Sequence, residues 1–159
     1  LSSCSPLYII WVLWNFPRMR NFTLQQTEFH RTPGIKAVRE QVFIQEQHVP
    51  EELEWDEHDA RAIHVVALDP NDQVIGTARL LGDGHIGRMA VLEAWRNNGI
   101  GSAMLEKLLL LAQQRKLSKV FLHAQTAAIG FYENHGFRTL GEEFMDAGIP
   151  HRYMEKDLN

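Results

Sequence analysis

The hydrophobic positions of the chain fall into two patterns with different periods. Short apolar or alternating runs bounded by turn residues predict β-strands. These runs cover residues 21–29, 62–68, 74–81, 85–92, 118–125, 137–144 and 151–156. Apolar side chains spaced three and four residues apart predict amphipathic helices. These helices cover residues 33–44, 99–115 and 127–134.

The order of these elements predicts the topology. Two short turns, at residues 70–72 and 82–84, join three strands into an antiparallel meander. The helix of residues 99–115 then separates two apolar strands, and such a unit is nearly always a right-handed parallel crossover. Residues 88–91 and 120–125 are therefore expected to be parallel neighbours. The order β-α-β-β-β-α-β-α-β-β predicts a mixed α/β sheet with helices on both faces, in a single domain.

A glycine-bearing turn separates the strand of residues 85–92 from the long helix. Glycines let a ligand approach the backbone, and the first turn of a helix offers N–H groups without intrahelical partners. Phosphate suits such a helix start, and Arg96 adds a charged donor. The turn lacks the Lys-Ser/Thr pair of a Walker A motif and the third glycine of a dinucleotide-binding fingerprint. It predicts a pyrophosphate site formed by Arg96, Asn97, Asn98, Gly99, Ile100, Gly101 and Ser102.

Composition and charge narrow the classes of function. The chain has 159 residues, of which 45% are hydrophobic and 23% charged, as in ordinary globular domains. Its net charge of -4 argues against nonspecific nucleic-acid binding. Cys4 is the only cysteine, so an intrachain disulfide and a cysteine-based zinc site are excluded. The eight histidines show no HxxxH or HExxH spacing, so we expect no metal.

Residues 1–18 form an apolar segment that stands apart from the patterned part of the chain. The run of residues 6–17 is too short to span a bilayer, and it lacks the basic start and small-residue cleavage site of a signal peptide. We expect no membrane association. Because Met19 immediately precedes the first patterned strand, we expect one domain over residues 19–159. The leading segment is then either an extension foreign to the domain or an apolar arm that docks on this or another subunit.

Residues 45–59 are rich in carboxylates and include a few apolar residues, Trp55 among them. A solvated acidic loop is the ordinary interpretation. A loop anchored by Trp55 beside a cofactor site could instead recognise a cationic amine. Arg79 and Arg88 lie in apolar strands, where a buried arginine needs partners. They either pair with these carboxylates or bind a substrate carboxylate, and we favour the ion pair for Arg79 and the substrate for Arg88.

Motifs in a fixed order along residues 20–157 resemble one protein family. The segments that carry the resemblance are VFIxEQ at 42–47, DxxD at 56–59, His64, GTARLL at 76–81, IGRMAV at 86–91, the Arg96 turn, HAQ at 123–125, FYxxxGF at 131–137 and GIPH at 148–151. In these segments the chain resembles GNAT N-acetyltransferases, specifically the ElaA/YjcF-like branch. Residues 1–18 have no counterpart in that pattern.

The resemblance implies the GNAT acyl-CoA N-acyltransferase fold, in which a central wedge between two parallel strands receives acetyl-CoA as co-substrate. It also implies that backbone groups of Met89, Ala90 and Val91 pair with the pantetheine arm, and that the Val91 N–H polarises the thioester carbonyl. The implied reaction is direct acetyl transfer to a primary amine of a small molecule or peptide. A cytoplasmic location is expected, and the tendency of the family to dimerise makes a homodimer an expectation by analogy.

The family pattern, combined with side-chain chemistry, assigns candidate catalytic roles. Tyr132, a phenol with a reference pKa of about 10, is the candidate acid that protonates the leaving thiolate. His151 is the first candidate base, because its reference pKa of about 6.5 suits neutral pH. His123 and then Glu46 are the alternatives, and bulk water is a fourth. The residues expected to contact the acceptor are Arg88, Gln125 and Glu46.

A second function is compatible with the same fold, namely a non-catalytic module that binds acyl-CoA as a sensor or partner domain. Loss of Tyr132 or of the glycine turn would mark such a module, and both are present. The enzyme is therefore the favoured hypothesis. A coenzyme A thioester with a longer acyl chain is a third alternative as the donor, because the volume of a pocket cannot be read from the sequence.

Overall fold

The computed structural model describes residues 20–159, so the segment 1–18 lies outside the described residues. The strands are β1 (Thr23–Thr27), β2 (Ile63–Leu68), β3 (Val74–Leu80), β4 (Ile86–Val91), β5 (Lys119–Gln125), β6 (Arg138–Asp146) and β7 (Ile149–Asp157). The helices are α2 (Pro33–Arg39), α3 (Glu51–Glu54), α4 (Ile100–Gln114) and α5 (Ile129–Glu133). The predicted order of strands and helices is confirmed except for the short helix α3, which lies in the acidic stretch predicted as a loop, and most predicted ends shift by only a few residues.

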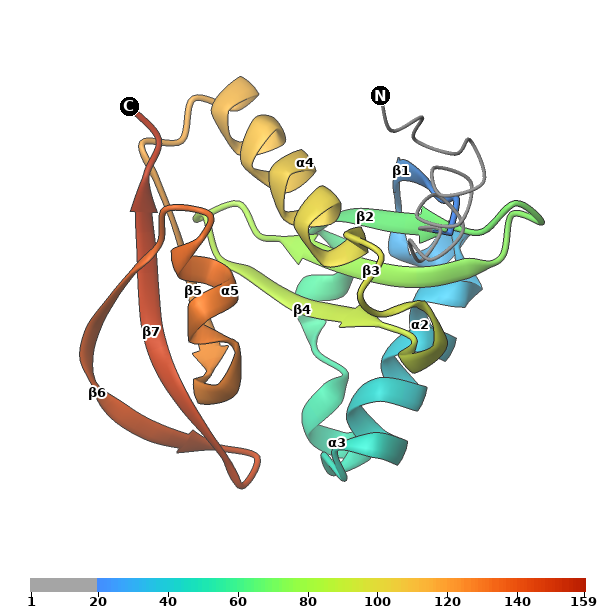
Figure 1. Cartoon of the computed structure of the whole chain (residues 1–159), viewed down its shortest axis with the longest axis horizontal. Helices are drawn as coiled ribbons and strands as arrows, with labels where there is room; N and C mark the ends of the chain where they lie inside the picture. Colours follow the sequence, from blue (N-terminus) through green and yellow to red (C-terminus); the bar gives the residue numbers. More distant parts are fainter. Residues whose placement is uncertain (1–19) are drawn as a thin grey trace, which may run out of the picture.

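The strands form two sheets that meet at β4 and β5 (Figure 1). The first sheet has the antiparallel order β1-β2-β3-β4, and the second has the order β5-β7-β6, with β7 antiparallel to both neighbours. In the described part of the chain, one parallel bridge, between His85 and Phe121, joins the two sheets. The expected wedge is therefore present. The two strands are parallel neighbours as predicted, but their pairing stops before residues 88–91 are reached.

A β-bulge in β4 accompanies this separation. The register pairs Gly87 with Arg79 and Ala90 with Thr77. Between these two pairs, β4 has two residues where β3 has one. Arg88, within the bulge, has a φ of 47°, in the left-handed region that most residues avoid. A bulge bends its strand and increases the local twist. We attribute to it the turning of β4 away from β5.

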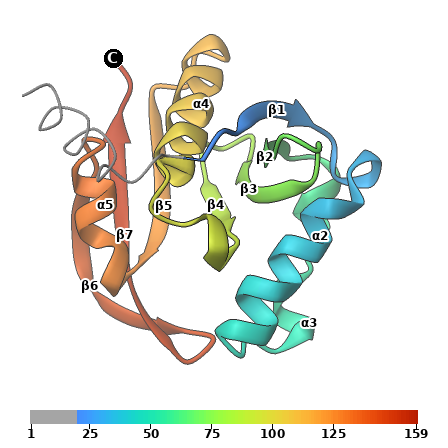
Figure 2. The same cartoon turned by 45° about the vertical axis from the view of Figure 1, so that its right-hand side comes forward.

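Helices cover both faces of the first sheet, as the sequence predicts. α4 packs over β2, β3 and β4 and buries Met104 and Leu108 fully. α2 lies on the opposite face, where Val38 and Val42 pack against Ala90 of β4 (Figure 2). None of the helices within residues 20–159 is long and apolar enough to cross a bilayer.

The helix predicted for residues 33–44 changes its type midway. α2 ends at Arg39, and the segment Glu40–Glu46 continues with π-helical hydrogen bonds. Such segments are rare and frequently lie at functional sites. Here the segment brings Phe43 and the following Gln47 to the wall of a cavity in the wedge.

A buried arginine–carboxylate network fastens the acidic stretch to the sheet. Arg39 is only 1% exposed, and its Nε and Nη1 each lie 2.7 Å from a carboxylate oxygen, of Glu54 and Asp59 respectively. Arg79 Nη1 donates to Asp56 at 2.8 Å and to Asp59 at 2.9 Å. The structural ion pair favoured for Arg79 is therefore present. No pattern in the sequence marks Arg39 as buried, because a single arginine in an amphipathic helix is usually exposed.

These contacts change the titration of the carboxyl groups. Burial would raise the pKa of Asp59, but hydrogen bonds and charges of Arg39 and Arg79 outweigh it and hold this pKa below its ordinary value. For Glu54, burial dominates and raises the pKa although Arg39 and Arg88 lie nearby. The buried carboxylates of the stretch are thus bound by arginines and are not free to recognise an amine.

Removal of the buried arginine should destabilise the protein far more than removal of an exposed one. Arg39→Met removes the closer arginine partner of two buried carboxylates, Glu54 and Asp59, and breaking a buried pair costs about 3–5 kcal/mol. Arg31→Met is the control, because the Arg31–Glu28 pair is exposed on both sides and such pairs contribute about 0–1 kcal/mol. We expect urea unfolding at neutral pH to show this difference.

The effect should also depend on pH with a definite sign. The pKa of Asp59 is lower in the folded than in the unfolded protein. Its contribution to the free energy of unfolding is therefore fully present above the pKa that Asp59 has in the unfolded chain, and it is lost as the pH falls through its pKa in the folded protein. Equal losses of unfolding free energy in the Arg39 and Arg31 variants would contradict the structural role of Arg39.

Candidate functional site

Two cavities meet inside the wedge. The larger one, which we call the groove, has a volume of about 550 Å³ and runs between β4, the start of α4 and α5. The smaller one, the side pocket, has a volume of about 290 Å³ and lies between β4, β5, the α3 segment and the β6–β7 hairpin. Both cavities are lined by Gln47, Met89, Ala128 and Tyr132. The two cavities therefore adjoin at these residues.

The groove contains nearly all of the residues predicted to bind pyrophosphate or a pantetheine arm. It is lined by Met89, Ala90, Val91, Arg96, Asn97, Gly99, Ile100, Gly101 and Ser102. The exception is Asn98, whose Nδ2 donates to the carbonyl groups of Trp95, at 2.9 Å, and Arg96, at 3.0 Å. The side chain of Asn98 thus shapes the turn and does not line the groove.

The start of α4 is open toward the groove. Gly99 has a φ of 78°, which glycine adopts without strain, and it gives the helix no side-chain cap. A Cβ added at Gly101 would meet only Phe131, at 3.5 Å, an ordinary van der Waals distance. The first N–H groups of α4 therefore lack a capping side chain and face an uncrowded surface, which fits an anionic group.

Arg96 links the turn to two other elements. Its Nε donates to the carbonyl of Val91 at 2.9 Å, and its Nη2 donates to the carboxylate of Glu46 at 2.8 Å. Glu46 was expected in the acceptor site as a third candidate base, but it is not among the residues that line either cavity. The structure instead places its carboxylate on Arg96, where it orients the guanidinium beside the groove.

The backbone of β4 presents unpaired groups to the groove. The N–H of Leu92, just after β4, donates to the carbonyl of Ile75 in β3 at 2.9 Å. Successive N–H groups of a strand point to opposite sides, so the N–H of Val91 points away from β3, toward the side from which β5 has separated. Such an edge can take an extended ligand as an added strand.

A hydrogen-bonded chain that the sequence analysis missed supports the start of α4. His135 Nε2 lies 3.1 Å from Ser102 Oγ, and His135 Nδ1 lies 2.6 Å from a carboxylate oxygen of Glu106. Ser102 and Glu106 are one helical turn apart, which was the available signal. His135, however, follows α5, and only the tertiary structure brings it to them.

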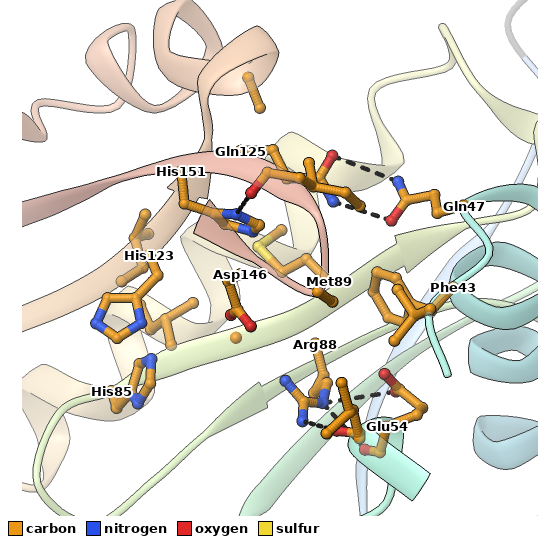
Figure 3. Close-up of a pocket in the computed structure, with 18 of the residues that line it drawn as sticks. Phe43, Gln47, Glu54, His85, Arg88, Met89, His123, Gln125, Asp146 and His151 are labelled. Carbon is orange, nitrogen blue, oxygen red and sulfur yellow. Dashed lines mark hydrogen bonds and ion pairs between the residues drawn. The ribbon is translucent and has the colours of Figure 1, made fainter. Parts of the chain in front are cut away.

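Alternation along β5 sends its polar side chains toward the side pocket. Val120 and Ala124 are buried in the core, whereas His123 and Gln125 point to the other face. His151 of β7 is the register partner of Gln125 and joins the same face. The polar and charged residues around the side pocket include His85, Arg88, His123, Gln125, Asp146 and His151 (Figure 3).

The ring of His151 has a defined orientation. Its Nδ1 lies 2.7 Å from the carbonyl oxygen of Ile149. A carbonyl oxygen can only accept, so Nδ1 carries a proton. In the neutral imidazole the lone pair is then on Nε2, which makes this atom the basic one. Phe144 stacks on the ring with a centroid distance of 6.0 Å and supports its orientation.

Two further histidines form another wall of the side pocket. The ring centroids of His85 and His123 are 4.9 Å apart. Burial, helped by the charge of His123, lowers the pKa of His85 to about 4, and burial also lowers the pKa of His123. Both rings are therefore mainly neutral at neutral pH. Within residues 20–159, no group of three or more His, Cys, Asp or Glu side chains is arranged to hold a metal ion.

Tyr132 lies where the two cavities meet. Its hydroxyl group points toward the sulfur of Met89, at 3.6 Å. Burial raises the pKa of Tyr132 to about 12, so the phenol keeps its proton throughout the physiological range. A neutral phenol at this junction can donate a hydrogen bond and, to a strong enough base, a proton.

Arg88 and Gln125, the other predicted acceptor contacts, both line the side pocket. Arg88 donates to the backbone carbonyl of Glu54 and to the carboxylate of Asp56, both at 3.3 Å. Gln125 and Gln47 exchange side-chain hydrogen bonds of 2.9 and 3.4 Å. Each residue therefore faces the pocket while it is held by protein partners.

Comparison with known proteins identifies the family. Residues 23–158 match the model of the acetyltransferase (GNAT) domain. The chain belongs to the GNAT acetyltransferase family. It is 42% identical to the uncharacterized N-acetyltransferase YjcF of Bacillus subtilis over 124 residues, which cover 76% of this chain and 88% of YjcF. It is 30% identical to protein ElaA of Escherichia coli over 133 residues, which cover 79% of this chain and 86% of ElaA.

Solved structures agree with this assignment. The crystal structure of Escherichia coli ElaA matches with a TM-score of 0.76 and 26% identity, covering 84% of this chain and 99% of that one. An acyl-CoA N-acyltransferase from Pseudomonas aeruginosa matches with a TM-score of 0.77 and 26% identity, covering 86% of this chain and 99% of that one. The ElaA/YjcF-like branch indicated by the sequence motifs is thus confirmed, and the GNAT family uses acyl-CoA.

The hydrogen bonds of two histidines predict opposite tautomers. His151 donates from Nδ1 to Ile149, whereas the Nε2 of His64 lies 2.8 Å from the carbonyl oxygen of Asp59 and donates to it. NMR of the imidazole nitrogens at about pH 8, above the ordinary histidine pKa of about 6.5, should show the Nδ1–H form for His151 and the Nε2–H form for His64. An Nε2–H form for His151 would contradict the orientation of its ring.

Proposed function

We propose that the protein transfers an acetyl group from acetyl-CoA directly to a primary amine of a small molecule or peptide. The observation that carries this proposal is the meeting of the groove and the side pocket at Tyr132, the one ionisable residue among those described that lines both cavities. A donor in the groove and an acceptor in the side pocket would come together beside a proton source. Membership of the GNAT family supports acyl transfer as the reaction.

The groove fits the pyrophosphate and pantetheine parts of coenzyme A. The first turn of α4 has no acidic side chain to repel a phosphate, and Arg96 stands beside it. The hydroxyl of Ser102, held by His135, is a further polar group at the helix start. The unpaired edge of β4 offers backbone groups that match the amides of a pantetheine arm.

Backbone and side chains of this chain would then perform three tasks. Acetyl-CoA supplies an activated acyl group, whose C–S bond breaks as the amine nitrogen forms the new C–N bond. The N–H of Val91 would donate to the acyl oxygen as it gains negative charge. His151 Nε2 takes the proton that the amine loses, and the Tyr132 hydroxyl provides the proton for the leaving sulfur.

His151 is favoured as the base over the alternatives. Its tautomer leaves Nε2 as the basic atom. The lowered pKa of His123 makes that ring a weaker base, and the carboxylate of Glu46 is bound to Arg96. Gln125 and Arg88 would orient the acceptor from the walls of the side pocket. The homodimer and the cytoplasmic location stay predictions from the sequence.

Gly101→Glu should weaken the binding of coenzyme A. The new carboxylate would stand in the first turn of α4 and repel phosphate, while the Cβ is accommodated at 3.5 Å from Phe131. Gly82→Glu is the control, because nothing lies within 4 Å of its Cβ. By calorimetry we expect Kd for coenzyme A to rise about tenfold or more, or about 1.4 kcal/mol, in the Gly101 variant alone. An unchanged Kd would overturn the assignment of the groove.

Tyr132→Phe should slow turnover while it leaves coenzyme A binding nearly intact. General acid catalysis contributes about 10²–10⁴-fold, so we expect kcat to fall by at least the lower factor. Tyr153→Phe is the control, because the Tyr153 hydroxyl donates to Glu155 at 3.1 Å and that residue is not among those lining either cavity.

The assay is thiol release from acetyl-CoA with a panel of primary amines. A wild-type rate in the Tyr132→Phe variant would remove Tyr132 from the acid role. Binding of coenzyme A without amine-dependent thiol release for any member of the panel would favour the non-catalytic acyl-CoA module instead.

A further inference from the structure

The charges around the side pocket are almost fully compensated by protein partners. The carboxylate of Glu54 lies 2.7 Å from Arg39 Nε and 3.5 Å from Arg88 Nε. Arg88, on the same wall, also lies 3.3 Å from a carboxylate oxygen of Asp56. These opposite charges neutralise one another, so this wall offers an acceptor little net charge.

The histidines of the pocket add no positive charge in the proposed reaction. His85 and His123 are mainly neutral at neutral pH, because burial disfavours their charged forms. His151 enters the proposed reaction as a neutral base. These histidines therefore do not form a positively charged wall that would repel a cation.

Asp146 differs from Glu54, the other carboxylate among the residues that line the side pocket. It ends β6 and lines the pocket, and within residues 20–159 its carboxylate lies within 4.0 Å of no Lys, Arg or His nitrogen, unlike those of Glu54 and Asp56. Figure 3 shows this carboxylate directed into the cavity, between His123, Met89 and Arg88. Asp146 is exposed to solvent at the rim of the cavity, and no cation of the described residues forms an ion pair with it.

Aromatic rings occur on the same face of β6 as Asp146 and in the lining of the side pocket. Phe144 precedes Asp146 by two residues on β6, so both side chains point to the same face of the strand. The ring of Phe144 packs edge-on against His123, at 5.4 Å, and face-on against His151, at 6.0 Å. Phe43 lines the same cavity from the π-helical segment. A carboxylate near aromatic faces is a suitable environment for an organic cation.

The turn that follows Asp146 holds it in place. Ala147 and Gly148 have φ values of 49° and 76°, and Asp146 pairs with Ile149 across them. Two consecutive residues with positive φ are typical of a tight two-residue hairpin. Alanine is strained in this conformation, and such strain is often retained at functional sites.

We propose that Asp146 binds a second cationic group of the acceptor, so that the substrate is a diamine or a longer polyamine and not a simple monoamine or an amino acid. The proposal specifies the acceptor of the acetyl transfer proposed above and rests on it. One amine of the substrate would face His151 at the junction of the cavities, and another ammonium group would pair with Asp146 at the hairpin.

Three acceptors with the same four-carbon chain test this assignment. Putrescine carries a second ammonium group, butylamine carries a methyl group in its place, and γ-aminobutyrate carries a carboxylate. With acetyl-CoA and the wild-type protein, we expect kcat/KM for putrescine to exceed that for butylamine by about tenfold or more, the ratio that corresponds to one charge-assisted contact. γ-Aminobutyrate should be the poorest acceptor, because Asp146 repels its carboxylate.

Asp146→Asn should remove the preference for putrescine over butylamine, mainly through KM. Glu142→Gln is the matched control, because Glu142 is an exposed carboxylate on the same strand that does not line the side pocket, and it should keep the preference. Equal kcat/KM for putrescine and butylamine in the wild-type protein would overturn the proposal. So would a preference that survives in Asp146→Asn, or a preference for γ-aminobutyrate, which would instead point to Arg88.

A binding measurement separates this proposal from the proposed function. Putrescine and butylamine are titrated into the complex with coenzyme A while the imidazole signals of His123 and His151 are followed by NMR. Tighter binding of putrescine that depends on Asp146, without acetyl transfer to any amine, would support the cation site and overturn the transferase. Acetyl transfer with no Asp146-dependent binding of putrescine would overturn the cation site alone.

Discussion

The unpaired edge of β4 is the constraint on which the rest of the structure depends. Backbone N–H and C=O groups need partners. β4 pairs along its length with β3 alone, and on its other edge the Val91 carbonyl accepts from Arg96. The bulge at Arg88 and the single bridge at His85 leave the other edge open. One sheet thus becomes two, and the groove lies in the gap. The same edge points the N–H of Val91 toward the place where the proposed reaction needs a hydrogen-bond donor.

The buried arginines determine how the acidic stretch of residues 45–59 is arranged. Buried ion pairs are weak sources of net stability, but loss of one partner is costly, so the network around Arg39 and Arg79 strongly favours one arrangement of the chain between α2 and β2. That arrangement places Glu54 and Leu53 on the wall of the side pocket. The buried carboxylates of this stretch are therefore part of a structural wall, whereas Glu51, Glu52 and Glu57 are exposed to solvent. The carboxylate of the pocket without an ion-pair partner comes from another hairpin, β6–β7.

The two cavities differ in how they are built. The groove consists mainly of backbone groups from one continuous stretch, β4 through the start of α4. The side pocket combines side chains from β4, β5, β6, β7 and the segment that includes Phe43. Backbone recognition suits a donor such as acyl-CoA, which the whole GNAT family shares. Side chains collected from distant segments can vary independently, so this pocket can change without altering the groove.

The sequence by itself determined the order of the main elements, the glycine turn before the long helix and the family, because these depend on local periodicity, on glycine positions and on motifs in fixed order. It also indicated Tyr132 and His151, which recur in such motifs. Only the tertiary structure decided that Glu46 binds Arg96, that Arg39 is buried and that Asp146 has no ion-pair partner among the described residues. The physical reason is that burial and charge compensation depend on neighbours far away in the chain, and no local pattern encodes them.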